Sequence, residues 1–204
     1  RRFCGRFLFC LQSPGDGREV TIEVADFNHF GRELWQEQAA VVSTDGETWT
    51  DLGLDRITLV PWTPTGNEAE DASIDDGWHP PYGVRYRLRL TAPVMWIASA
   101  TPYALGHSEE HLQSLTRRCT FFSLQEIGRT HYTDRHGYSL QMMRVARPGD
   151  EGKLRVVVIA GEHPSEVAGM YAAEGLLEEL LRSSDVLSDF SFWVIPVVNV
   201  DGVA

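Results

Sequence analysis

Residues 154–204 decide the fold of the chain, and they read LRVVVIAGEHPSEVAGMYAAEGLLEELLRSSDVLSDFSFWVIPVVNVDGVA. Residues 154–160 form an apolar run rich in β-branched side chains, which is typical of a strand buried on both faces of a parallel sheet. Apolar residues then recur at helical spacing from Val167 to Leu181, and residues 190–198 form a second apolar strand. This order of strand, helix and strand predicts a parallel crossover unit.

Two polar side chains, His163 and Glu166, follow the first of these strands. Open α/β sheets place their sites at the carboxyl ends of strands, and side chains three residues apart across such a turn can converge. A His and a Glu are two of the three protein ligands of a His2Glu catalytic zinc site, whose fourth position stays open for water. The sequence therefore predicts that His163 and Glu166 bind zinc. The alternative for Glu166 is favourable interaction with the helix dipole alone.

The chain resembles the zinc carboxypeptidases, most closely their cytosolic branch. The resemblance is carried by His-Pro-Ser-Glu at residues 163–166 and by Asn-Val-Asp-Gly at residues 199–202. The family pattern in the second motif is Asn-Pro-Asp-Gly, so Val200 departs from it. Residues 127–129 and 137–140 also fit the two strands that precede these motifs in the family.

This resemblance implies a zinc enzyme that hydrolyses C-terminal peptide bonds with a zinc-activated water, acting on the C-terminus of a peptide or protein. It implies that His163 and Glu166 are zinc ligands. It also implies a second His ligand, an arginine that binds the substrate carboxylate and a catalytic glutamate, all of which lie beyond residue 204 in the family. We therefore expect no catalytic residue within these 204 residues, and an incomplete chain that is inactive alone.

The first part of the chain predicts a different architecture. Many short strands separated by turn signals indicate an antiparallel β-sandwich, which we place at residues 1–118, ahead of the first half of an α/β zinc carboxypeptidase domain with a mixed sheet at residues 119–204. Residues 19–24 and 84–90 alternate apolar with polar side chains, so each predicts a strand with one buried face. The inward set is expected to be Val20, Ile22 and Val24, and the outward set Arg85, Arg87 and Arg89.

A competing metal motif lies at residues 107–111, within a helix predicted at residues 103–115. The residues fit His-x-x-Glu-His, in which His107 and His111 share one face of the helix. The helix is short and follows predicted sandwich strands, with no repeated α/β unit around it. We therefore favour a partly exposed helix over a zinc site here.

Composition limits the partners of the chain. The formal net charge of −11 argues against nucleic acid or an anionic membrane as the main partner, and no apolar run reaches the ~20 residues of a membrane span. The three cysteines, Cys4, Cys10 and Cys119, are an odd number, which favours reduced thiols in the cytoplasm.

Two other functions stay open at this stage. In one, the sandwich is a non-catalytic binding module and the second domain no longer acts as an enzyme. In the other, the chain is a related zinc amidohydrolase of N-acyl amino acids. Those enzymes usually carry His-Gly-x-Glu, so Pro164 counts against this second alternative.

Overall fold

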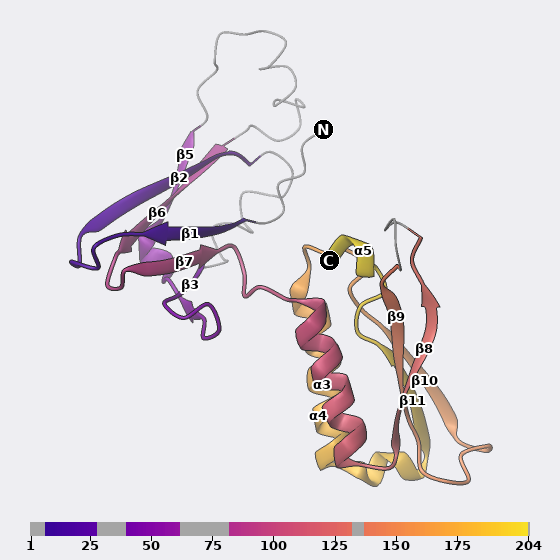
Figure 1. Cartoon of the computed structure of the whole chain (residues 1–204). Coiled ribbons are helices and arrows are strands. Elements are labelled where there is room, and N and C mark those ends of the chain that lie inside the picture. The colour runs from indigo at the N-terminus through magenta and orange to yellow at the C-terminus, as the bar shows by residue number, and fades with distance from the viewer. Residues whose placement is uncertain (1–6, 28–39, 62–81, 132–136, 204) are drawn as a thin grey trace, which may run out of the picture. The chain divides into compact units, whose positions relative to one another are not determined.

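The structure is a computed structural model that describes residues 7–27, 40–61, 82–131 and 137–203 (Figure 1). The chain divides into two compact units, Arg1–Pro102 and Tyr103–Ala204. The sequence places the boundary after residue 118 instead. The difference is the helix between the two positions, whose residues Leu112 and Leu115 pack into the core of the second unit.

The first unit contains two antiparallel sheets, with strand orders β1-β7-β3-β4 and β2-β6-β5. Its elements are β1 (Leu8–Gln12), β2 (Glu19–Phe27), β3 (Val41–Ser43), β4 (Thr50–Asp51), the short 3-10 helix η1 (Leu54–Arg56), β5 (Ile57–Pro61), β6 (Tyr82–Arg89) and β7 (Val94–Ala98). Both sheets contribute to one apolar cluster, in which Tyr86 and Leu88 of β6 meet Ile97 of β7. The antiparallel strands predicted for this part of the chain are therefore present.

The alternation in β2 and β6 is confirmed. Val84, Tyr86 and Leu88 are at most 1% exposed, and the inward residues of β2 pack against the same cluster. The three arginines of β6 lie on the opposite, exposed face. The register places Glu23 opposite Arg85 and Glu19 opposite Arg89, so this outward face carries both signs of charge.

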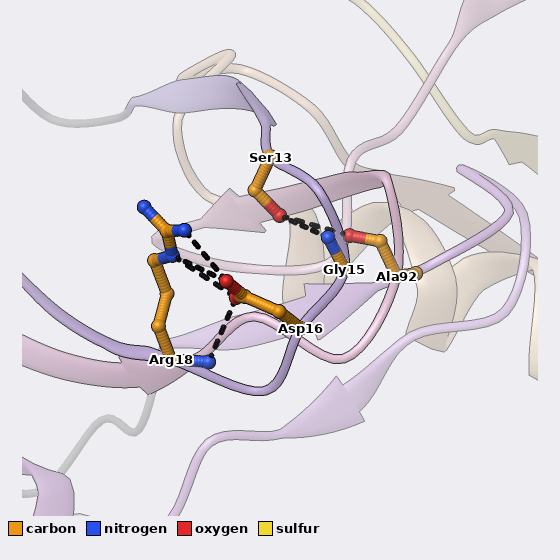
Figure 2. A network of polar contacts seen from close by, with 5 residues as sticks. All are labelled: Ser13, Gly15, Asp16, Arg18 and Ala92. Carbon is orange, nitrogen blue, oxygen red and sulfur yellow. Dashed lines mark hydrogen bonds and ion pairs between the residues drawn. The ribbon is translucent and has the colours of Figure 1, made fainter.

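A polar network holds the turn between β1 and β2 (Figure 2). The Ser13 hydroxyl donates to the carbonyl of Ala92, 3.3 Å away in the turn before β7, and accepts the backbone N–H of Gly15. Asp16 receives two N–H groups of the Arg18 guanidinium, and this interaction lowers the pKa of Asp16 to about 2. The network links the turn between β1 and β2 to the turn between β6 and β7.

The second unit is a mixed sheet with helices. Its elements are α3 (Leu105–Arg118), β8 (Phe122–Arg129), β9 (Ser139–Val145), β10 (Leu154–Ile159), α4 (Val167–Arg182), the 3-10 helix η2 (Ser184–Ser188), β11 (Phe190–Ile195) and the single turn α5 (Val200–Val203). The strand order is β10-β11-β9-β8; β10 and β11 are parallel, and the other pairs are antiparallel. The predicted strand–helix–strand unit with parallel strands is confirmed.

The core of the second unit lies between the sheet and its helices. Buried residues of α3 and α4 pack against inward side chains of the strands, among them Met143, Val145 and Val194. Figure 1 shows α3 and α4 side by side on one side of the sheet. The helices thus bury one face of the sheet.

The prediction that residues 154–160 are buried on both faces is wrong. Val156 and Val158 of β10 pack against the helix-side core, whereas Val157 is 62% exposed and Ile159 is 59% exposed. Among the described residues, β10 is one of the two edge strands of its sheet and no helix covers its second face. Its composition is that of an interior strand, but its position in the sheet is at the edge.

Two further findings concern the surface and the thiols. Cys10 and Cys119 are free thiols, and Cys4 lies outside the described residues. None of the described helices is long and apolar enough to span a bilayer.

Candidate functional site

The site begins where β10 ends. Gly161 follows the strand with φ of 66°, a backbone conformation that side-chain-bearing residues rarely adopt. A Cβ atom at this position would lie 3.0 Å from the Cα of Val197 and 3.1 Å from Met170. Glycine therefore allows the chain to turn sharply in the narrow space between Val197, which follows β11, and Met170 of α4. Helix α4 then begins at Val167, so Pro164 lies in the turn before the helix rather than in its first helical turn.

The turn brings His163 and Glu166 together. Nδ1 of His163 lies 2.9 Å from Oε1 of Glu166, and the backbone N–H of Glu166 donates to the carbonyl of His163 at 3.0 Å. The hydrogen bond to Glu166, and then its negative charge, raise the pKa of His163. Both side chains are about two-thirds exposed, 67% and 66%. They are therefore open to solvent, metal ions and ligands.

The two side chains help to line a groove of about 370 Å³ between β10 and α4. Small residues of α4 line one wall, namely Gly169, Ala172 and Ala173. The last residues of β10 line the other wall. A mostly apolar lining with a few polar groups is typical of small-molecule and cofactor sites.

The side-chain donor atoms of His163 and Glu166 are of the kinds that bind zinc, but a catalytic zinc site needs one protein ligand more than these two. Imidazole nitrogen and carboxylate oxygen are both ordinary zinc ligands, and here they converge within hydrogen-bond distance. A catalytic zinc site takes three protein ligands. No group of three or more His, Cys, Asp or Glu side chains that could hold a metal ion occurs in the described parts of the chain.

The competing motif at residues 107–111 has a different environment. His107 is exposed on α3. Nε2 of His111 lies 3.9 Å from Oε1 of Glu178 on α4, and Glu178 also accepts two hydrogen bonds from Arg118. The Arg118 guanidinium is the main cause of the lowered pKa of Glu178. His111 therefore belongs to a polar contact between α3 and α4.

Sequence reasoning assigned no role to the side chain of Asn199. In the structure its amide Nδ2 donates to the carbonyl of Glu162 at 3.2 Å, directly beside the candidate ligand His163. The available signal was the position of the Asn-Val-Asp-Gly motif, because parallel strands end at the same edge of a sheet.

In the comparisons with known proteins, a family match covers the segment that contains His163, Glu166 and Asn199. The family model described as zinc carboxypeptidase matches residues 108–204. Solved structures with the same fold include a metallo-carboxypeptidase from Burkholderia cenocepacia, with 21% identity and a TM-score of 0.69. Another is a metallo-carboxypeptidase from Pseudomonas aeruginosa in complex with (2-guanidinoethylmercapto)succinic acid, with 20% identity and a TM-score of 0.69. A search of curated proteins gives no match.

The extent of these matches matters. Each of the two structural matches covers 97% of this chain and 47% of the solved chain, so the chain spans about half the length of the metallo-carboxypeptidases that it resembles. The likeness extends over both units at the level of fold, and the comparisons do not single out the cytosolic branch. The motif, the mixed sheet and the family match thus agree over residues 108–204, the part of the chain that is similar to the zinc carboxypeptidases.

Proposed function

We propose that this chain carries the first part of the active site of a zinc metallocarboxypeptidase, an enzyme that hydrolyses the C-terminal peptide bond of a peptide or protein. The observation that carries the proposal is the convergence of His163 and Glu166 at the end of β10, within the family-matched segment. His163 and Glu166 would hold the metal. Bound zinc lowers the pKa of a water molecule to about 7 and polarises a carbonyl group.

The pair His163 and Glu166 could bind a zinc ion, but two protein ligands are fewer than a catalytic zinc site has. Two protein ligands leave a metal ion mostly hydrated, so zinc should bind weakly and a chelator should remove it readily. We therefore propose that the 204-residue chain alone is inactive, because hydrolysis requires a third ligand and a general base beyond the described pair.

The remaining assignments follow from the same proposal. The two sheets of the first unit, which share one apolar cluster, form a β-sandwich domain ahead of the peptidase segment. We place the protein in the cytoplasm, with neither nucleic acid nor a membrane as a partner, because its net charge is −11 and its cysteine count is odd. The solved Pseudomonas aeruginosa enzyme binds a succinic acid derivative, which fits a substrate that ends in a carboxylate.

The test is zinc titration by calorimetry on the chain and on three variants. The wild-type chain should bind zinc weakly, and His163→Ala or Glu166→Ala should weaken binding about tenfold or more, which corresponds to at least about 1.4 kcal/mol. His107→Ala is the matched control, because it removes an exposed histidine from the competing motif and should leave binding unchanged. Binding that survives His163→Ala, or is lost in His107→Ala, would contradict the proposed site.

The second readout is a digest of a short peptide with added zinc. No release of C-terminal residues is expected from the chain alone. Zinc-dependent release that disappears in His163→Ala would show that the described residues already complete the site, and would overturn the proposed inactivity.

A further inference from the structure

The turn after β11 is hydrogen-bonded to the turn that carries His163. The two parallel strands continue their pairing past their ends, because the N–H of Val198 donates to the carbonyl of Ala160 at 2.9 Å. The N–H of Asn199 then donates to the carbonyl of Gly161 at 3.1 Å. The next contact along this line comes from a side chain, since Nδ2 of Asn199 donates to the carbonyl of Glu162 at 3.2 Å.

The other end of the Asn199 amide is also engaged. Its Oδ1 accepts the backbone N–H of Gly202 at 3.1 Å. One planar amide therefore bridges the carbonyl before His163 to the first residues of α5. A bridge of this kind needs a donor and an acceptor on one side chain, and the asparagine amide provides them as separate groups, the NH2 and the carbonyl oxygen.

Gly202 brings α5 close to the same turn from another direction. A Cβ atom there would lie 2.9 Å from Nδ2 of Asn199 and 2.9 Å from Cγ of Pro164. Such distances are too short for a side chain, so the close approach of α5 requires glycine. Of the residues on both sides of His163, Glu162 is thus held through its carbonyl, and Pro164 leaves no room for a side chain at Gly202 beside it.

We propose that Asn199 is a positioning residue for the His163–Glu166 pair. Both members of the pair are about two-thirds exposed, so packing restrains their side chains little and their convergence depends on the backbone of residues 161–166. Asn199 fixes that backbone at Glu162. This inference rests on the proposed zinc site, in which ligands held in place bind metal more tightly.

The experiment compares Asn199→Ala and Gly202→Ala with Thr130→Val. The first variant removes the amide that forms the bridge. The second keeps the asparagine and places a methyl group against its amide and against Pro164. The control removes a similar exposed side-chain acceptor in the same unit, because Thr130 Oγ1 accepts the N–H of Tyr138 at 3.0 Å. All four proteins are measured under conditions in which circular dichroism shows that they are folded.

The first readout needs no metal. Amide hydrogen exchange should accelerate at Glu166, whose N–H donates to the carbonyl of His163, in Asn199→Ala and in Gly202→Ala. The exchange rate of the Glu166 amide should stay unchanged in Thr130→Val. The exchange rate of the Met143 amide, in the core of the same unit, should stay unchanged in all three variants. The second readout is the zinc dissociation constant, which should rise about tenfold or more in the two site variants, the effect typical of residues that orient metal ligands.

The outcomes separate the two proposals. If the wild-type chain binds no zinc, the proposed zinc site fails, and the exchange rate at Glu166 still decides whether Asn199 holds the turn. If the wild-type chain binds zinc and Asn199→Ala binds it equally well, the positioning role is overturned. An equal loss of affinity in Thr130→Val also overturns it, because general loosening of the unit would then explain the effect.

Discussion

Strands β6 and β10 both place apolar side chains against a core, and they differ in their outward residues and in their neighbours. Strand β6 lies between β2 and β5, and its inward residues are at most 1% exposed. Strand β10 is paired on one side only among the described strands, and three of its apolar side chains are 59–66% exposed. The comparison shows that the burial of a strand depends on what packs against it, which its own composition does not state.

The outward faces of the two sheets differ in the same way. In the first unit, arginines of β6 face glutamates of β2 across the sheet, and Arg85 pairs with Glu23 at 2.6 Å. In the second unit, Trp193 of β11 is flanked by the guanidinium groups of Arg144 and Arg155, 5.8 and 5.7 Å from its ring centroid. The outward apolar side chains of β10 have high exposure, so uncovered apolar surface concentrates along this strand.

The largest expected difference comes from one substitution made on both strands. Leu88→Ala in β6 should lower the free energy of unfolding by about 2–5 kcal/mol, since Leu88 is 1% exposed and its loss leaves a cavity. Leu154→Ala in β10 should change it by no more than about 0.5 kcal/mol, because Leu154 is 66% exposed. Urea unfolding followed by NMR signals from each unit separates the two effects. Equal losses would mean that β10 is covered in solution.

The outline of the fold could be predicted from the sequence because most of its signals are local. Alternation by two identified the inward residues of β6, and helical spacing identified α4. The exposure of Val157 could not be predicted, because a continuous apolar run is consistent with an interior strand and with an edge strand that lacks a cover. Likewise, α3 packs into the second unit through Leu112 and Leu115, a long-range contact that no short motif signals.

The candidate site was predictable to the same extent. His163 and Glu166 could be singled out because a glycine, a strand end and a helix start fix their surroundings locally. The contact from Asn199 to Glu162 spans 37 residues. The contact forms because the parallel strands β10 and β11 end side by side, with Ile159 paired to Ile195. This register could not be read from the sequence.

The second prediction tests the exposed strand directly. A strand with an open edge and exposed apolar side chains invites pairing between chains, so the 204-residue chain should self-associate reversibly in sedimentation velocity experiments. Val157→Lys should raise the dissociation constant about tenfold or more, equivalent to about 1.4 kcal/mol. A lysine there places a hydrated charge where the apolar surface would be buried.

The matched control for this prediction is Gln125→Lys on β8, the strand at the other edge of the same sheet. It adds the same charge at an exposed position without removing an apolar side chain, and should leave association nearly unchanged. A wild-type chain that stays monomeric at high concentration would contradict the prediction. Equal weakening by both lysines would contradict it as well: an added lysine lowers the magnitude of the net charge of −11 and so reduces repulsion between chains, and association would then not depend on the apolar surface of β10.

The smallest effect is expected on the charged face of the first unit. Arg85 and Glu23 are 49% and 43% exposed, so solvent screens their attraction, and Glu23→Gln should cost about 0.2–1 kcal/mol of unfolding free energy. The cost should fall toward zero in 1 M NaCl, where the Debye length is about 3 Å. Glu47→Gln, at an exposed turn position with no ion pair among the described contacts, serves as the control and should be neutral. A larger, salt-insensitive loss would mean that this pair stabilises the sheet through packing, and the contrast between a charged outward face and an apolar one would then be weaker than the structure indicates.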